Sequence, residues 1–427
     1  MKINRYVISQ RLHEGVCLLT NFTNKTHILV SEEVLSVFNN NSIDELKKMF
    51  PDVYDQLLRS RYILEDDIDE FDELCSKNER DIADNQMYHI VINPTLDCNL
   101  SCWYCYENRV PNSSISNSVI NGICKHISLK FKEEPFSFLK ISFFGGEPIM
   151  KFSSIEKIAA FSSSFCEQNN INLLLDFTTN GTLLTSSYIS RLSKYACAFQ
   201  ITLDGNKEQH NKVKYMKSRT VDTFSLTIRN IKDIQKNISN SFVSIRINYD
   251  GETLKHFNSV LEELSLLDKT RCKIILKKIW QVSREELSKD LITDVTENLR
   301  NLGFFVDEYG DPGICFADRK NQAVINYDGN VFKCTTINKF DNENALGYLD
   351  ANTGKIIWDD KKTAYLNNRD LLESCTTCMI FPTCTGPCRR RMFLQPNWEC
   401  PYTKPDFDVC YYARSLFYNE IAELQFK

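Results

Sequence analysis

The fold is decided by one short stretch, Asp97-Cys98-Asn99-Leu100-Ser101-Cys102-Trp103-Tyr104-Cys105-Tyr106-Glu107, which follows an apolar run at 88–92. Its cysteines are spaced Cys-x3-Cys-x2-Cys, so a tight loop can direct three sulfurs at one centre. Structural zinc normally takes four ligands, and an iron–sulfur cube held only by cysteine also takes four. A cube held by three thiolates keeps one iron open, which a small molecule can chelate. The alternative is that the cysteines are core residues or zinc ligands.

This spacing, with the aromatic Tyr104 before the third cysteine, resembles the radical S-adenosylmethionine (SAM) superfamily. The resemblance implies that Cys98, Cys102 and Cys105 hold a catalytic [4Fe–4S] cluster whose open iron binds the amine and carboxylate of SAM. It also implies the chemistry. An electron from the cluster splits SAM into methionine and a 5′-deoxyadenosyl radical, which abstracts hydrogen from the substrate.

The composition is that of an ordinary soluble globular protein, with 42% hydrophobic and 25% charged residues. A chain of 427 residues can form two or three domains. The net charge of −5 gives no electrostatic reason to expect nucleic acid or membrane partners, and no apolar run is long enough to span a bilayer. We find no export signal after residue 5. We therefore expect a cytoplasmic protein whose 17 cysteines are metal ligands and free thiols, not disulfides.

Strand-like and helical segments alternate from residue 88 to about residue 310. The strand candidates are 88–96, 139–144, 173–178, 199–203, 242–249 and 273–280, and the helical segments include 116–131, 155–168, 187–195, 223–235 and 254–267. Six strand–helix units predict a parallel sheet with helices outside it. The count fits the partial (βα)6, TIM-like barrel of the radical SAM core. In such a fold the chemistry lies at the C-terminal ends of the strands.

Polar motifs follow these strands. The second strand leads into Gly145-Gly146-Glu147-Pro148. Its glycines let the backbone approach a ligand closely, and its glutamate can accept hydrogen bonds from an ammonium group. The resemblance implies that this segment binds the amine of SAM. It also implies that the hydroxyl of Thr202, where the family often has serine, contacts the carboxylate of SAM, and we expect Asn180 to help shape the same pocket.

Charged and polar residues on later strands are less certain markers of the pocket. Arg246 and Asn248 alternate with apolar neighbours and should point into the barrel. There Arg246 either pairs with a carboxylate in the SAM pocket or forms a buried structural ion pair. Asp204 matches a family position and is expected to have a supporting role. We expect His210 to be a surface or helix-end residue.

From residue 315 the sequence carries a second set of cysteines. Cys315 is followed by Gly329 and Cys334, and then come Cys375-x2-Cys378-x5-Cys384-x3-Cys388, Cys400 and Cys410. Residues 323–334 predict a hairpin with an Asp-Gly turn. The arrangement resembles the C-terminal SPASM domain of radical SAM peptide maturases, which houses two auxiliary [4Fe–4S] clusters. The chain would then hold three such clusters.

The resemblance assigns Cys375, Cys378, Cys384 and Cys410 to one auxiliary cluster, and Cys315, Cys334 and Cys388 to the other. Some family members have a further cysteine where this chain has Asn321. The inner cluster is therefore expected either to take Cys400 or to keep an open iron, and Cys400 is also an alternative to Cys410. A zinc ribbon is another explanation of the closely spaced cysteines. The remaining cysteines are expected to be small apolar core residues, namely Cys17, Cys75, Cys124, Cys166, Cys197 and Cys272.

Residues 1–85 precede the cysteine loop. Strands are predicted at 5–12 and 15–30, with a turn at 21–25, and helices at 31–38, 42–50 and 53–60. This order resembles the winged-helix-like peptide-recognition domain of many peptide-modifying enzymes, in which a leader peptide adds a strand to a sheet edge. The alternative is a packing domain without a ligand. The acidic stretch 66–84 is expected to be a linker.

Together these patterns predict an α/β protein with a peptide-recognition-like domain at 1–85, a radical SAM partial barrel at 86–310 and a SPASM domain at 311–427. The expected function is that of a radical SAM oxidoreductase that matures a ribosomally made precursor peptide (RiPP maturation). It would abstract hydrogen from a side chain or backbone carbon and form an intrapeptide thioether or carbon–carbon cross-link. Expected partners are the leader-bearing peptide and a reductant such as flavodoxin or ferredoxin. The alternatives are an anaerobic sulfatase-maturing enzyme, which forms formylglycine, and a non-catalytic metal-binding adaptor.

Overall fold

The computed structural model of the chain describes residues 1–216, 220–279, 289–309, 313–368, 370–395, 399–400, 402 and 407–425. The chain forms two compact units. The terminal unit comprises residues 1–83, 312–318 and 364–421, and the barrel unit comprises 84–311, 319–363 and 422–427. The predicted division of the sequence at 85/86 and 310/311 stays a prediction. No helix in the described part of the chain has both the length and the apolar character needed to cross a membrane.

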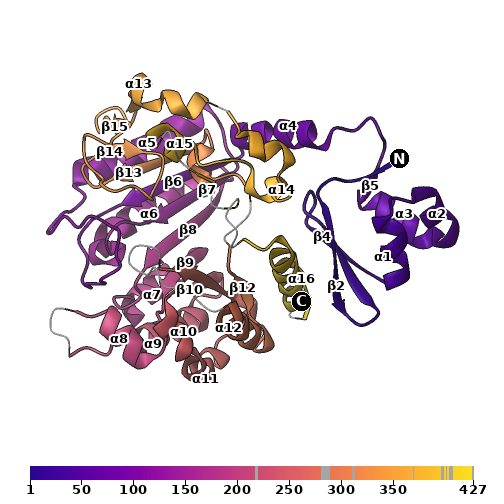
Figure 1. The fold of residues 1–427 in the computed structure, drawn as a ribbon. Helices are drawn as coiled ribbons and strands as arrows, with labels where there is room; N and C mark the ends of the chain where they lie inside the picture. Colours follow the sequence, from indigo (N-terminus) through magenta and orange to yellow (C-terminus); the bar gives the residue numbers. More distant parts are fainter. Residues whose placement is uncertain are drawn as a thin grey trace. The chain divides into compact units, whose positions relative to one another are not determined.

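An eleven-stranded sheet of described residues forms the centre of the barrel unit (Figure 1). Six of its strands are parallel neighbours in chain order. They are β6 (Met87–Asn93), β7 (Phe138–Phe143), β8 (Asn172–Thr179), β9 (Cys197–Thr202), β10 (Ser241–Tyr249) and β11 (Cys272–Lys278). The predicted parallel α/β core is confirmed, and residue 280, the end of the last predicted strand, lies outside the described residues.

Further strands extend both edges of this core. At one edge β12 (Phe305–Asp307) runs parallel to β11. At the other edge β13 (Gln322–Asn326) runs parallel to β6, and the antiparallel strands β14 (Asn330–Phe332), β15 (Gly347–Leu349) and β16 (Ile356–Trp358) follow. The predicted hairpin is the β13–β14 pair, whose turn contains Gly329 at φ 89°. The part of the chain that follows the predicted barrel therefore continues the barrel sheet.

Helices connect the strands and cover the sheet with a shared apolar core. The rings of Phe143, Phe177 and Phe199 stack across β7, β8 and β9 with centroids 5.3 and 5.1 Å apart. The predicted helix at 254–267 is instead interrupted, as α10 (Gly251–Lys255), the 3-10 turn Phe257–Val260 and α11 (Leu261–Ser265). The other described helices are α5 (Asn117–Glu133), α6 (Phe152–Gln168), α7 (Ser186–Leu192), α8 (Lys207–Val213), α9 (Thr223–Asn237), α12 (Lys289–Asn301) and α13 (Asp360–Thr363).

The front of the terminal unit has the predicted order of strands and helices. The antiparallel sheet β2-β3-β4 (Val7–His13, Val16–Asn21, Thr26–Val30) is followed by α1 (Glu32–Asn39), α2 (Ile43–Met49) and α3 (Pro51–Arg59). Ser31 caps α1 as its position predicts, because its hydroxyl accepts a hydrogen bond from Val34 N at 3.3 Å. The short strands β1 (Lys2–Ile3) and β5 (Ile63–Leu64) pair with each other.

Residues 70–83 form a helix, α4 (Glu70–Ala83), where the sequence predicted a linker. The prediction was wrong because the many charges conceal a helical stripe. Leu74 and Ile82 are buried, whereas Asp72 and Glu73 are exposed. The ring of Phe71 contacts Phe381, with centroids 4.9 Å apart.

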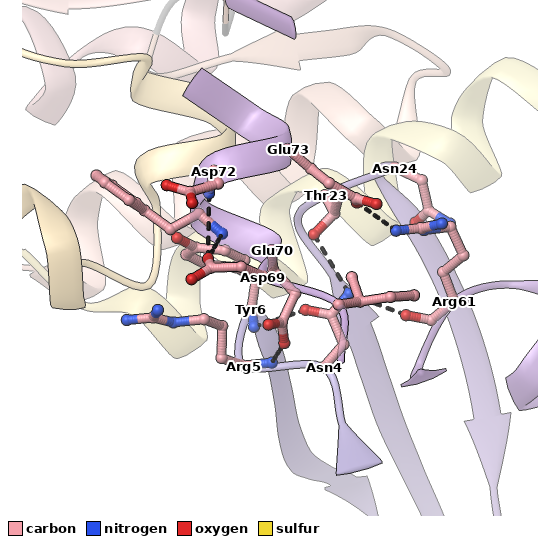
Figure 2. A network of polar contacts seen from close by, with 12 residues as sticks. Asn4, Arg5, Tyr6, Thr23, Asn24, Arg61, Asp69, Glu70, Asp72 and Glu73 are labelled. Atoms are coloured by element: carbon pink, nitrogen blue, oxygen red, sulfur yellow. Dashed lines mark hydrogen bonds and ion pairs between the residues drawn. The ribbon is translucent and has the colours of Figure 1, made fainter. Parts of the chain in front are cut away.

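A polar network fixes the start of α4 (Figure 2). The carboxylate of Glu70 is 5% exposed and accepts hydrogen bonds from Arg5 N at 3.1 Å and Lys2 Nζ at 3.0 Å. Asn4 Nδ2 donates to the carbonyl of Arg61 at 2.9 Å (Figure 2). These bonds join α4 to the first residues of the chain.

The C-terminal helices belong to the same unit. They are α14 (Phe381–Cys384), α15 (Arg389–Leu394) and α16 (Val409–Gln425), preceded by 3-10 turns at Ala364–Asn367 and Glu373–Thr377. The helix α16 packs on the front sheet. Tyr412 stacks on Phe22 with centroids 5.8 Å apart, and Gln10 Nε2 donates to the Cys410 carbonyl at 3.1 Å. Segments from the two ends of the sequence therefore stabilise each other.

Candidate functional site

The cysteine loop leaves the C-terminal end of β6 in a fixed conformation. Ser113 anchors it, because its hydroxyl accepts a hydrogen bond from Leu96 N at 2.8 Å and its carbonyl accepts one from Thr95 Oγ1 at 2.7 Å. The carboxylate of Asp97 then accepts hydrogen bonds from Cys98 N at 2.8 Å and Asn112 N at 2.9 Å. The loop is thus shaped by local hydrogen bonds at both of its ends.

The three predicted cluster ligands lie together in this loop. Cys98 and Cys102 are partly buried and Cys105 is exposed. The charge of Cys102 acts on both of the other thiols, and burial raises the pKa of Cys98 to about 12. No group of three or more His, Cys, Asp or Glu side chains in the described residues could hold a metal ion as it stands. The donor set nevertheless fits a cluster with one open iron, because the loop offers three thiols and no fourth.

The Gly-Gly-Glu segment that follows β7 pairs with the cysteine loop. Gly146 N donates to the Thr95 carbonyl at 3.1 Å, and Glu147 N donates to the Asp97 carbonyl at 2.8 Å. A Cβ atom on Gly145, whose φ is 103°, would lie 2.4 Å from Thr95 O, and one on Gly146 would lie 2.2 Å from Asp97 O. The glycines therefore let two backbones approach each other closely.

Glu147 is fully buried and connects the ends of β7 and β8. One carboxylate oxygen accepts hydrogen bonds from Ile149 N at 3.0 Å and Thr179 Oγ1 at 2.8 Å, and the other accepts one from Asn180 N at 2.8 Å. Burial raises the pKa of Glu147 in spite of these donors. The carboxylate thus already has three donors from the chain itself.

The remaining predicted pocket residues lie at the C-terminal ends of the next strands. Asn180 Nδ2 donates to Asn99 Oδ1 at 2.9 Å and lies 3.8 Å from Cys98 Sγ. Thr202 and Arg246 are register partners on β9 and β10. The guanidinium Nε of Arg246 donates to Asn248 Oδ1 at 2.9 Å. The structure therefore brings Asn180 to the cysteine loop and sets Thr202 beside Arg246.

Sequence reasoning missed Lys214, a buried lysine at this site. Its Nζ lies 4.0 Å from Cys102 Sγ, 3.7 Å from Asp204 Oδ2 and 5.8 Å from the centroid of the Tyr104 ring. Burial alone would lower the pKa of Lys214, but Cys102, Tyr104 and Asp204 outweigh it and hold that pKa well above its usual value. The only sequence signal was the position of Lys214 shortly after the Asp204-Gly205 motif.

The sequence suggested that His210 is a surface or helix-end residue, and it lies in the last turn of α8 but not at the surface. It is fully buried, and its Nδ1 accepts a hydrogen bond from Asp204 N at 3.1 Å. Burial lowers its pKa well below the usual value. The imidazole is therefore a neutral structural group that holds the turn after β9.

Most cysteines assigned to the auxiliary clusters lie in the terminal unit. Cys375, Cys378, Cys384 and Cys400 act on one another electrostatically, and burial raises the pKa of the first three. Burial also raises the pKa of Cys410, where the charges that act are Asp408 and Arg414. The charge of Cys75 acts on Cys375 as well, and the choice between Cys400 and Cys410 as a cluster ligand stays a prediction. For the inner cluster, Cys315 and Cys388 belong to the terminal unit, while Cys334 and Asn321 belong to the barrel unit.

Residues 92–264 match the family model of the radical SAM superfamily. This match contains the cysteine loop and the strands from β7 to β10, so this part of the chain is a radical SAM domain. Residues 315–379 match SPASM, an iron–sulfur cluster-binding domain. The chain therefore carries a radical SAM domain followed by a SPASM domain, which is a domain that binds iron–sulfur clusters.

Two curated relatives align with more than half of the chain. The cysteine-type anaerobic sulfatase-maturating enzyme of Clostridium perfringens is 23% identical over 368 residues, which cover 77% of this chain and 93% of the relative. The radical SAM cyclopropyl synthase TigE of Paramaledivibacter caminithermalis is 21% identical over 276 residues, or 60% of this chain and 56% of TigE. The chain thus spans little more than half of TigE, and it spans 39% of the Methanocaldococcus jannaschii protein MJ0907.

Two solved structures show the same fold. The structure of anSMEcpe with bound AdoMet and the Cp18Cys peptide has a TM-score of 0.53 and 20% identity, covering 79% of this chain and 97% of that chain. Streptococcus suis SuiB bound to S-adenosylmethionine has a TM-score of 0.51 and 16% identity, covering 92% and 97%. These likenesses concern the fold and confirm the radical SAM α/β architecture.

Proposed function

We propose that this enzyme is an oxidoreductase that matures a leader-bearing precursor peptide by forming an intrapeptide thioether or carbon–carbon cross-link. The observation that carries the proposal is the folded front of the chain, a three-stranded sheet with three helices before the barrel. The likeness to SuiB leaves only about 34 residues unmatched, so it extends into residues 1–83. The likeness to anSMEcpe leaves about 90 unmatched, which is enough to omit that segment.

The residues of the barrel unit would have three separate roles. Cys98, Cys102 and Cys105 would hold the catalytic [4Fe–4S] cluster, which together with SAM supplies a hydrogen-abstracting 5′-deoxyadenosyl radical. Asn180 and the Gly-Gly-Glu segment hold the cysteine loop in place through the hydrogen bonds described above. Thr202 ends β9 and Arg246 lies beside it on β10, so a hydroxyl and a guanidinium can receive a carboxylate there.

The SPASM cysteines would hold two auxiliary [4Fe–4S] clusters, which supply an electron acceptor near the peptide. A cross-link removes two hydrogens from the peptide. One leaves with the 5′-deoxyadenosyl group, and the other leaves as a proton after its electron has been accepted. A small reductant protein, such as flavodoxin or ferredoxin, would deliver the first electron.

The test of the reaction is anaerobic incubation with SAM, a reductant and the peptide encoded beside the gene, followed by mass spectrometry. A cross-link lowers the mass by two hydrogens and suppresses fragmentation between the joined residues. Formation of an aldehyde that reacts with a hydrazide would contradict the proposal and favour the second candidate. That candidate is a sulfatase-maturing enzyme, favoured by the alignment over 93% of the Clostridium perfringens relative.

Leader binding would use an open edge of the front sheet, and the hydrogen-bond pattern says which residues face each edge. Phe22 N donates to the Tyr6 carbonyl, so Tyr6 and Phe22 are a hydrogen-bonded pair. Such pairs alternate along an antiparallel ladder. With the observed register, Ser9 directs its backbone N–H outward from β2, and Leu29 directs its own outward from β4.

Proline at an outward-facing position blocks strand addition without removing a bond inside the sheet. We expect either Ser9→Pro or Leu29→Pro, but not both, to weaken binding of a fluorescent leader peptide at least tenfold. Release of 5′-deoxyadenosine without peptide should be unchanged in both variants. Leader affinity that survives both substitutions would remove the front sheet as the leader site.

A further inference from the structure

We propose that Lys214 is a positioning residue whose buried positive charge raises the reduction potential of the catalytic cluster. The inference rests on the proposed role of Cys102 as a cluster ligand. It concerns the reduction potential of the cluster. Three thiolates give every such cluster a negative charge, so the cysteine triplet alone does not set the potential of this one.

Lys214 is a costly residue to bury, so its location requires a reason. Only 4% of it is exposed, and an ammonium group removed from water is destabilising unless it is paired. Its partners are Cys102 Sγ at 4.0 Å and Asp204 Oδ2 at 3.7 Å, and the centroid of the Tyr104 ring is 5.8 Å away. The ammonium therefore lies within 4.0 Å of both a predicted ligand sulfur and a carboxylate.

The chain holds this lysine on the cysteine loop itself. Ser101 N donates to the Tyr215 carbonyl at 3.0 Å, and Leu100 forms a β-bridge with Met216. On the other side, Thr223 Oγ1 donates to the Lys214 carbonyl at 2.6 Å. The ammonium and the Cys102 sulfur thus keep a fixed separation, because neighbouring backbone segments carry them.

Pairing with Asp204 does not by itself account for the lysine. Asp204 Oδ1 already accepts hydrogen bonds from Asn248 N at 3.1 Å and Asn248 Nδ2 at 3.3 Å, and Oδ2 accepts one from the Tyr104 hydroxyl. The carboxylate would remain hydrogen-bonded without Lys214. Among Tyr104, Asp204, Lys214 and Asn248, only Lys214 places a positive charge beside Cys102.

A fixed cation near a cluster favours the reduced state. Reduction adds one negative charge to the cluster, and the attraction to a cation about 4 Å from a ligand sulfur is stronger in a buried site than in water. Asp204 has the opposite sign and a similar location. Removing Lys214 should therefore lower the potential, and removing the charge of Asp204 should raise it.

The experiment is an anaerobic redox titration of the full-length holoenzyme, followed by electron paramagnetic resonance. The signal that changes when SAM is added, and that is absent from the Cys98→Ala variant, is assigned to the catalytic cluster, which separates it from the auxiliary clusters. We expect Lys214→Met to lower the ratio of reduced to oxidised cluster at least tenfold at a fixed potential, a shift of about 59 mV. Lys214→Arg should stay near the unaltered enzyme.

Asp204→Asn is the matched variant, because it removes a negative charge where Lys214→Met removes a positive one. We expect Asp204→Asn to raise the reduction potential of the catalytic cluster. The double variant Lys214→Met with Asp204→Asn should have a potential between those of the two single variants. A merely structural role would shift both single variants in the same direction or neither. An unchanged potential in Lys214→Met at full iron content overturns the inference. If Lys214→Met loses iron, the absence of an upward shift in Asp204→Asn overturns it instead.

The failure of the proposed function gives a different result. An unaltered holoenzyme without any SAM-responsive signal contradicts the cluster at Cys98, Cys102 and Cys105, and the inference falls with it. A SAM-responsive signal whose potential ignores the charge at 214 leaves the proposed function intact and removes only the role of Lys214.

Discussion

The two glycines at this site act by letting two backbone segments approach each other closely. Gly146 is the sharpest example, because a Cβ atom there would lie 2.2 Å from the Asp97 carbonyl oxygen and 2.8 Å from the Leu96 carbonyl carbon. Both contacts are to backbone, which cannot rotate away as a side chain can. We expect Gly146→Ala to displace the cysteine loop and to cost about 1–3 kcal/mol of stability.

The measurement for Gly146→Ala is iron content after anaerobic reconstitution, together with the SAM-responsive resonance signal. We expect iron to be lost selectively from the catalytic cluster. Gly15→Ala is the control for backbone strain without a clash, because Gly15 has φ 76° and a Cβ atom there would meet nothing within 4 Å. Full catalytic-cluster occupancy in Gly146→Ala would show that the loop position tolerates the added methyl.

The site residues that could be predicted from the sequence are those that belong to short motifs. The cysteine triplet and the Gly-Gly-Glu segment each span only a few positions, and their residue types and spacing indicate their chemistry. Lys214 could not be predicted in this way, because its neighbours come from the pairing of Tyr215 and Met216 with the cysteine loop, more than a hundred positions earlier. Tertiary contacts of this kind leave no local pattern.

At the scale of elements, α5 carries a buried histidine with a predictable pH effect. His126 Nδ1 donates to the Gly354 carbonyl at 2.8 Å, and its Nε2 accepts from the Tyr88 hydroxyl. Burial lowers the pKa of His126 from 6.5 to about 4. The unfolded chain therefore takes up the proton first as the pH falls. The stability due to neutral His126 is complete above pH 6.5 and is lost progressively between pH 6.5 and about 4.

Between pH 7.5 and 5.5 we expect this one group to cost roughly 1 kcal/mol of unfolding free energy. Urea titrations at both pH values measure the difference. The variant His126→Gln should be less stable at pH 7.5 but should show a smaller decrease on acidification. The same exchange at the exposed His256 is the control. Equal pH dependence in His126→Gln and the unaltered protein would contradict the assignment.

Strands and helices with a clear hydrophobic period were predicted well. Elements in which charges or an interruption obscure that period were not. The six parallel strands bury apolar residues at alternate positions or in short runs, so their centres were located within a few residues. The helix α4 was missed because its charged residues outnumber the buried Leu74 and Ile82. The interruption near Phe257 was missed because the whole segment keeps a helical apolar period.

At the scale of the whole molecule, the front segment and the C-terminal cysteine segment fold as one unit. Phe71 packs on Phe381, and Arg5 donates to the Thr376 carbonyl, next to Cys375. The sequence suggests that deletion of residues 1–85 would weaken substrate binding and spare SAM cleavage. The structure adds that such a deletion also uncovers the cysteines proposed for an auxiliary cluster.

We therefore expect a chain lacking residues 1–83 to lose iron from the auxiliary sites while it keeps the SAM-responsive signal of the catalytic cluster. Iron per chain and the resonance spectra, compared with those of the full-length holoenzyme, measure the two effects separately. Cys98→Ala is the matched control, since it should lose the SAM-responsive signal and keep auxiliary iron. Unchanged auxiliary iron in the truncated chain would show that these cysteines do not depend on the front segment.

The parallel pairing of β13 with β6 constrains how enzymes of this design can be recombined. The strand that leads into the catalytic cysteines is bonded along its length to a strand that follows Cys315 in the sequence. A chimaera joined near residue 311 would replace β13 with a strand from another protein. That strand would have to pair with β6 in the correct register. A crossover near residue 364, where the chain leaves the barrel unit, keeps the ladder native. Exchange of C-terminal segments between chains that carry these two domains should therefore succeed at the later junction and fail at the earlier one.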